Sequence, residues 1–164
     1  MAIDPEAFVI VDHLEQLDTE SKYVAHKAKE ASLHAYAPYS RFQVGAAVLL
    51  EDGTVVVGAN QENAAYPAGM CAERVALYAA AAQHPEAIIT KIAVAARRKG
   101  GKEIVPATPC GPCRQVLLEF ETRQNKPIEI VMQNQHHQWV KASSAASLLP
   151  FGFTHSALEH HDRK

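Results

Sequence analysis

The chain is short of cysteine, of net charge and of long apolar runs, and each shortage narrows what the protein can be. Its three cysteines fit a reducing cytosol, where disulfides are rare. A formal net charge of −2 offers no general attraction to nucleic acid or to an anionic membrane. No stretch is long enough to span a bilayer, and the acidic N-terminus lacks the apolar run of a signal peptide. These shortages favour a cytoplasmic protein that has no membrane and no nucleic acid as its partner.

The rest of the composition is that of an ordinary globular protein. An apolar content of 48% over 164 residues is enough for one domain with an ample core. We expect residues 18–164 to form that domain and residues 1–17 to be an N-terminal extension. Within the extension, residues 8–11 are expected either to add an edge strand or to pack on a neighbouring molecule. The dense basic run 97–102 contains two glycines, and we interpret it as a solvated loop rather than a phosphate site.

Periodicity and turn residues predict alternating helices and strands. Apolar faces indicate helices over 18–34, from Cys71 to a stop before Pro85, and from Cys110 to about Arg123. The expected strands are 44–50, 54–60, 92–96, 128–132 and 139–142, and Asp52-Gly53 joins the first two in a hairpin. Only about six residues separate the last two strands, whereas a parallel crossover needs a dozen or more. The last two strands must therefore pair antiparallel.

All three cysteines lie in two short motifs, Cys71-Ala72-Glu73 and Pro109-Cys110-Gly111-Pro112-Cys113. Cys110 and Cys113 are three residues apart, so they face the same way on one helical turn. Cys71 opens a second helix, and the positive ends of the two helices would favour thiolates around one ion. Three protein ligands leave one corner of a tetrahedral Zn²⁺ open for water, which is the layout of a catalytic zinc site.

Glu73 is the spare acid beside these ligands. It points roughly 200° around the helix from Cys71, so we expect it to flank the metal rather than bind it. A carboxylate in that place can transfer protons for a water molecule that the metal activates.

Each half of the pattern also has a simpler interpretation. Glu73 alone would be a first-turn residue stabilised by the helix dipole, and a lone C-x-x-C is often a redox pair or half of a structural zinc knuckle. A structural site would need a fourth ligand, and none of the nine histidines sits at ligand spacing from the cysteines. The two motifs together therefore favour catalysis.

Four segments, 35–47, 58–67, 71–74 and 109–115, resemble in their order the motifs of cytidine deaminases, and the similarity runs from about residue 21 to about residue 153. The resemblance is to the three-cysteine homotetrameric type. It implies an α/β fold, a three-layer α-β-α sandwich around a mixed sheet of about five strands, with 18–164 as the catalytic domain. It implies one Zn²⁺ per chain on Cys71, Cys110 and Cys113, with Glu73 as the catalytic acid and base. Arg74 matches an arginine that hydrogen-bonds to the zinc-bound sulfurs.

The resemblance also implies contacts with a nucleoside. Asn60 and Glu62 match the residues that bind the ribose 3′-hydroxyl in the family. Phe42 matches the aromatic residue that packs on the pyrimidine. The backbone of Ala72 lies where the family recognises the exocyclic amine.

Further contacts implied by the resemblance would cross subunit boundaries in a homotetramer. Ala64 and Tyr66 match positions that reach a neighbouring subunit's site, and Phe151 matches a C-terminal aromatic residue that closes another subunit's pocket. The segment Pro150-Phe151-Gly152-Phe153 is shorter than the common Pro-x-x-Phe-Gly, so either Phe151 or Phe153 could fill that role.

The leading hypothesis is zinc-dependent hydrolytic deamination of cytidine and 2′-deoxycytidine to the uridines, with release of ammonia, in pyrimidine salvage. The alternative on the same chemistry is a modified cytosine nucleoside such as blasticidin S. By resemblance, polynucleotide deaminases insert a helix between the last two strands, so the short connection here favours a small nucleoside. A zinc-stabilised binding module is the non-enzymatic alternative.

Overall fold

The structure is a computed structural model, and it describes residues 5–158. Six strands form one sheet in the order β1-β6-β5-β4-β2-β3. Their bounds are Phe8–Val11 (β1), Phe42–Leu50 (β2), Val55–Ala59 (β3), Ile89–Arg98 (β4), Glu129–Gln133 (β5) and Trp139–Ala142 (β6). The sheet is mixed, because β4 and β5 run parallel while the other neighbouring pairs run antiparallel.

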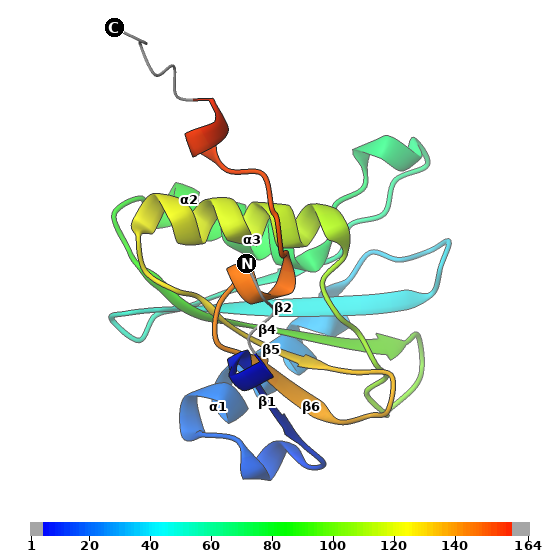
Figure 1. Cartoon of the computed structure of the whole chain (residues 1–164). Coiled ribbons are helices and arrows are strands. Elements are labelled where there is room, and N and C mark those ends of the chain that lie inside the picture. The colour runs from blue at the N-terminus through cyan, green and yellow to red at the C-terminus, as the bar shows by residue number, and fades with distance from the viewer. Residues whose placement is uncertain (1–4, 159–164) are drawn as a thin grey trace, which may run out of the picture.

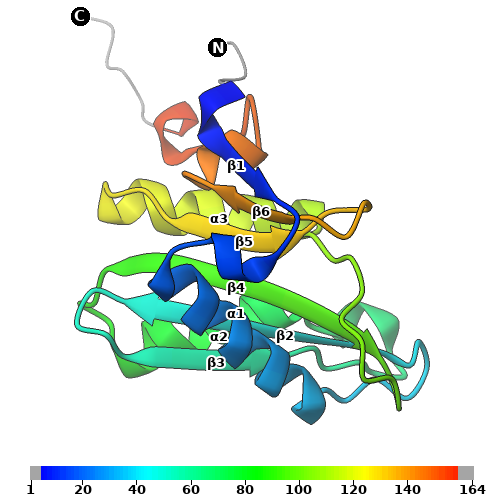
Figure 2. The ribbon, with the colours of Figure 1, turned by 90° about the horizontal axis from the view of Figure 1, so that it is seen from below.

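Helices cover both faces of this sheet. The helix α1 (Thr19–Ala31) lies on one face, and α2 (Ala72–Gln83) and α3 (Gly111–Gln124) lie together on the other (Figures 1 and 2). The predicted three-layer α-β-α sandwich is therefore confirmed. None of the helices in the described part of the chain combines the length and apolar character that a bilayer crossing requires.

The edges of the sheet bear out two expectations and adjust a third. Strands β5 and β6 pair antiparallel, with Ile130 opposite Ala142, which confirms the predicted hairpin. Strand β1 pairs antiparallel with β6, with Phe8 also opposite Ala142, so of the two options for residues 8–11 the edge strand is the one found. Because β1 joins the sheet, there are six strands rather than about five. The division of the chain at residue 17 stays a prediction.

Small residues let the helices approach the sheet closely. A Cβ on Gly58 of β3 would lie 2.5 Å from the backbone nitrogen of Ala76 and 2.6 Å from the carbonyl oxygen of Ala72. A side chain at Gly58 would therefore push α2 away from the sheet. The first turn of α2, which follows Cys71, is fixed by this backbone contact.

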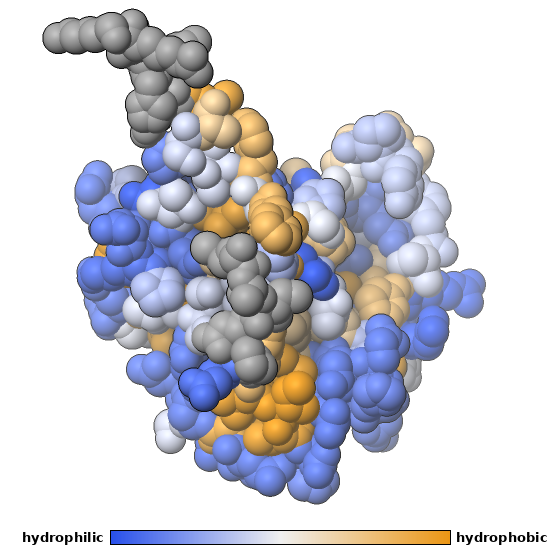
Figure 3. Space-filling view, viewed as in Figure 1, coloured by the Kyte–Doolittle hydropathy of each residue, from blue (hydrophilic) through white to orange (hydrophobic). Residues whose placement is uncertain are grey.

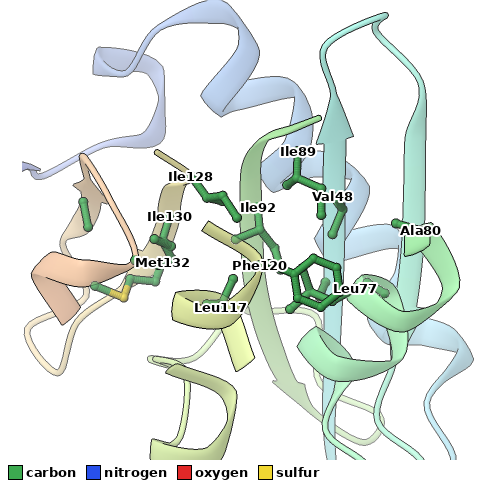
Figure 4. Packing of buried hydrophobic residues seen from close by; sticks show 14 of the residues in the cluster. Val48, Leu77, Ala80, Ile89, Ile92, Leu117, Phe120, Ile128, Ile130 and Met132 are labelled. Carbon is green, nitrogen blue, oxygen red and sulfur yellow. The ribbon is translucent and has the colours of Figure 1, made fainter. Parts of the chain in front are cut away.

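The main core lies between the sheet and the pair α2 and α3. Leu77 of α2 and Phe120 of α3 are buried there with Val48 of β2 and Ile92 of β4 (Figure 4). Because both helices pack on one cluster, their N-termini are held in a fixed relation to each other. A second cluster, which includes Val24 and Ala25, packs α1 against the opposite face.

The basic run predicted as a solvated loop begins inside a strand instead. Arg97 and Arg98 are the last residues of β4. The guanidinium of Arg97 donates to the Ser32 hydroxyl and to the Lys29 carbonyl oxygen, both at 2.8 Å. Arg97 therefore caps the C-terminal end of α1, where a cation is favourable. The loop interpretation was wrong for these two residues.

Candidate active site

Three sulfur atoms meet where α2 and α3 begin. Cys71 and Cys110 are the N-cap residues of the two helices, and Cys113 lies in the first turn of α3. The Sγ atoms of Cys71 and Cys110 are 3.7 Å apart, those of Cys110 and Cys113 are 3.3 Å apart, and all three lie within 4.8 Å of one another. Two sulfurs at about 2.3 Å from a tetrahedral zinc ion lie about 3.8 Å apart. The three thiol groups therefore fit a single Zn²⁺.

The surroundings favour the ionised form of at least one of these thiols. A hydrogen bond from the Cys113 thiol, opposed by partial burial and aided by hydrogen bonds from Arg74 and Cys110, lowers the pKa of Cys71 to about 5. The thiolate is the form that binds metal. Cys71 also caps a helix N-terminus, whose dipole favours negative charge.

Arg74 lies directly against the sulfur cluster. Its Nη2 donates to the Sγ of Cys71 at 3.6 Å. Three thiolates around Zn²⁺ carry a net charge of −1, and the guanidinium offsets it. The Nε of Arg74 is buried and has no hydrogen-bond partner among the described residues.

Glu73 is a buried carboxyl group in the first turn of α2. Only 4% of its surface is exposed, and burial raises the pKa of Glu73 to about 7. The three cysteines form a metal-ligating group without it among the residues the structure describes. A carboxyl group with a pKa near neutrality can both accept and return a proton at physiological pH.

A cleft of about 860 Å³ opens beside the cysteine cluster, a size usual for small-molecule sites. Cys71, Arg74 and Pro112 form part of its wall, and residues 60–70 form most of the rest. Figure 3 shows the hollow beside the lobe that carries the short helix η4 (Tyr66–Ala68). Four of the predicted substrate contacts line this cleft: Asn60, Glu62, Ala64 and Tyr66.

Asn60, which directly follows β3, forms hydrogen bonds with the start of β2. Its Oδ1 accepts from the backbone N–H of Val44 at 2.8 Å, and its Nδ2 donates to the carbonyl oxygen of Phe42 at 3.0 Å. An amide has two N–H groups and two carbonyl lone pairs. Asn60 therefore keeps one donor and one acceptor for a ligand.

Glu62 is held by the turn that precedes β2. Its Oε2 accepts from the backbone N–H groups of Tyr39 at 2.9 Å and Ser40 at 3.3 Å, and its Oε1 accepts from the Ser40 hydroxyl. The hydrogen bond from the Ser40 hydroxyl is the main cause that keeps the pKa of Glu62 below its usual range, ahead of the opposing effect of desolvation. Glu62 is therefore an ionised acceptor at the cleft wall.

The other predicted contacts do not line the cleft in the single chain. Phe42 is half-buried at the start of β2, and Ala72 is fully buried behind Cys71. Phe151 is 86% exposed and has a left-handed backbone (φ 59°), and Phe153 is 59% exposed. The roles of these residues stay predictions.

Sequence reasoning missed several residues of the cleft wall. Tyr39, Ser40, Met70 and Pro112 all line it. Met70 directly precedes Cys71, and Pro112 lies between Cys110 and Cys113, so proximity to the motifs was a usable signal for both. Tyr39 and Ser40 contact Glu62 across more than 20 positions of the chain, and no local pattern marks such a pair.

Comparison with known proteins agrees with this geometry. Residues 18–126 match the family model described as the cytidine and deoxycytidylate deaminase zinc-binding region. The chain is 41% identical over 128 residues to a cytidine deaminase of Halalkalibacterium halodurans, covering 78% of this chain and 89% of that protein. It is 39% identical over 147 residues to a cytidine deaminase of Sporosarcina psychrophila, covering 90% and 96%. The crystal structure of a cytidine deaminase from Burkholderia pseudomallei superposes with a TM-score of 0.66 at 40% identity, covering 84% of this chain and all of that one.

Proposed function

The chain belongs to the family of zinc-binding cytidine and deoxycytidylate deaminases, and we propose that it converts cytidine and 2′-deoxycytidine to the corresponding uridines with release of ammonia. The observation that carries the proposal is the pairing of three zinc-spaced sulfurs with a buried carboxyl group whose pKa is near neutrality. A modified cytosine nucleoside such as blasticidin S is not favoured, because the curated relatives described above are named cytidine deaminases.

Cys71, Cys110 and Cys113 would hold the zinc ion, which would supply the Lewis acidity that makes water nucleophilic at neutral pH. Glu73 would accept the proton that the attacking water releases as its oxygen bonds to C4, and would deliver that proton to N3 of the cytosine ring. Glu73 would then carry the proton of the new C4 hydroxyl to the exocyclic nitrogen, so that the C4–N bond breaks, ammonia leaves and C4 becomes a carbonyl carbon. The burial of Glu73 keeps bulk water from competing for the proton.

The hydrogen-bonding positions that Asn60 and Glu62 still have free suit one sugar hydroxyl. Asn60 has one N–H left to donate to the hydroxyl oxygen. Glu62 has three of its four acceptor positions filled by Tyr39 and Ser40, and the fourth can accept the hydroxyl proton. We assign these two residues to the 3′-hydroxyl, which cytidine and deoxycytidine share.

The base would lie between the sugar contacts and the sulfur cluster. The backbone of Ala72 follows Cys71 directly and would recognise the exocyclic amine. Phe42, tied through its carbonyl oxygen to Asn60, would pack on the ring.

We propose a homotetramer whose sites lie at subunit interfaces, acting in pyrimidine salvage in the cytoplasm. Tyr66 is 91% exposed on a projecting lobe, and Phe151 is 86% exposed. Aromatic side chains this exposed are typical of surfaces that a partner covers. Ala64 would contact the neighbouring site from the same lobe.

The test combines zinc quantitation on the purified protein with ammonia release from cytidine, deoxycytidine and blasticidin S. Glu73→Gln should keep its zinc and lose at least about 10²-fold in kcat, because an amide cannot carry the proton. Glu86→Gln, which removes an exposed carboxylate beyond the end of α2, should leave both unchanged. A chain that binds cytidine but releases no ammonia would instead be a zinc-stabilised binding module.

A further inference from the structure

The hydroxyl of Ser40 connects two groups that the proposed mechanism uses separately. It donates to Oε1 of Glu62 and accepts from the backbone N–H of Phe42 at 3.0 Å. A serine hydroxyl has one proton to donate, and here that proton is committed to the carboxylate. Ser40 therefore links the sugar contact to the backbone of the residue expected to pack on the base.

The surrounding hydrogen bonds leave the side chain of Glu62 little freedom. The backbone N–H of Glu62 donates to the carbonyl oxygen of Tyr36 at 2.8 Å, and the N–H of Tyr36 donates to the carbonyl oxygen of Asn60 at 3.0 Å. The Tyr39 and Ser40 N–H groups hold Oε2, and the Ser40 hydroxyl is the one side-chain donor on Oε1 among the described residues. Without this hydroxyl, the carboxylate of Glu62 could rotate about its Cγ–Cδ bond and turn its free acceptor position away from the cleft.

We propose that Ser40 is a positioning residue, which aims the free acceptor position of Glu62 into the cleft so that it selects a ligand carrying a sugar hydroxyl there. This inference rests on the proposed function, because it takes the ligand to be a cytosine nucleoside held through its 3′-hydroxyl. Ser40 also lines the cleft, so the hydroxyl lies beside the ligand it helps to select.

The proposal separates binding from chemistry. Ser40 contacts neither the sulfur cluster nor Glu73 by any hydrogen bond that the structure contains among its described residues. Removal of the hydroxyl should therefore raise KM for cytidine and leave kcat nearly unchanged. Since a hydrogen bond to a charged group is lost, the expected rise is about tenfold.

The experiment compares wild type, Ser40→Ala, Ser40→Thr and Ser143→Ala on cytidine and on 3′-deoxycytidine. Ser143 is an exposed serine after β6, so Ser143→Ala controls for the loss of a surface hydroxyl. Ser40→Ala should lower the preference of kcat/KM for cytidine over 3′-deoxycytidine by about tenfold. Ser40→Thr keeps a hydroxyl and should restore that preference, and Ser143→Ala should not change it.

Other outcomes overturn the proposal. If Ser40→Ala lowers kcat/KM equally for both substrates, the residue is merely structural. If Ser40→Ala changes kcat/KM for neither substrate, the orientation of Glu62 does not depend on Ser40. Should the wild-type chain release no ammonia from cytidine, the proposed function fails by itself. Calorimetric binding of the two nucleosides to the same variants then decides the role of Ser40. If Ser40→Ala does not change the preference for cytidine over 3′-deoxycytidine, or if neither nucleoside binds, the positioning role is rejected.

Discussion

Replacement of Lys91 by methionine tests the network that fastens α1 to the sheet. Lys91 is only 3% exposed on β4, and its Nζ contacts Asp18 at 3.0 Å, Glu129 at 2.7 Å and the Ser21 hydroxyl at 3.0 Å. Methionine keeps the length of the side chain but removes the charge. Glu20 also lies 3.6 Å from the ammonium group, so Lys91→Met would leave three carboxylates without their buried partner.

The expected loss in the free energy of unfolding of Lys91→Met lies between two limits. Removing one partner of a fully buried ion pair costs about 3–5 kcal/mol, whereas exposed pairs contribute about 0–1 kcal/mol. The side chains of Asp18 and Glu129 are 41% and 33% exposed, so water solvates part of the charge that is left behind. We expect about 2 kcal/mol, or a fall in Tm of about 4–8 °C for a chain of this size.

Lys141→Met is the matched control. Lys141 contacts two of these carboxylates, Asp18 at 3.0 Å and Glu129 at 3.4 Å, but its side chain is 22% exposed. Its loss should cost no more than about 0.5 kcal/mol. Urea unfolding of the two variants measures the difference, and equal losses, or no loss for Lys91→Met, would refute the argument that burial sets the magnitude.

The same network predicts a pH dependence with a definite sign. Partial burial raises the pKa of Asp18, but hydrogen bonds from Ser21, Lys141 and Lys91 outweigh it and hold the pKa well below its usual range. A depressed pKa stabilises the fold above the ordinary carboxyl pKa of about 4, and the stabilisation is lost as the pH falls below that value. The stability that Asp18 contributes to the wild type should therefore fall between pH 7 and pH 3, and urea unfolding at the two pH values measures the change.

Two further predictions concern the metal site. Cys113→Ser should reduce zinc content and Tm together, because metal binding is coupled to folding; a chelator that strips zinc from the wild type without lowering Tm would contradict this. Gly58→Ala should cost about 2–4 kcal/mol and also lower zinc content, because the new Cβ meets the backbone of α2. Gly111→Ala, where a Cβ meets nothing within 4 Å, should cost nothing or stabilise by up to about 1 kcal/mol; urea unfolding and metal quantitation decide both.

The parts of the fold and site that were predictable from the sequence depend on local rules. The last hairpin followed from the length of one connection, and the meeting of the three cysteines followed from two short motifs at expected helix starts. The position of Glu73 outside the sulfur group followed from helix geometry alone.

The rest depended on contacts between distant parts of the chain. Ser40 and Glu62 are 22 positions apart, and Arg97 reaches Ser32 across 65 positions. The clash that a side chain at Gly58 would cause appears only once α2 is placed over β3. Even β1 could be anticipated only as one of two options, because whether an apolar tetrapeptide pairs or packs depends on the edge that the fold offers it.

The site has two physically different parts, one at the starts of two helices and one in an exposed segment. The three cysteines and Glu73 lie at the starts of helices that a shared core and a backbone contact at Gly58 hold in place. The opposite wall belongs to residues 61–70, an exposed segment whose backbone is bridged between Gln61 and Met70. Substitutions in that wall can therefore change which sugar is accepted without moving the zinc ligands. Substitutions that disturb the contact between α2 and β3 displace Cys71 and Glu73 together, so zinc content and turnover should fall in parallel.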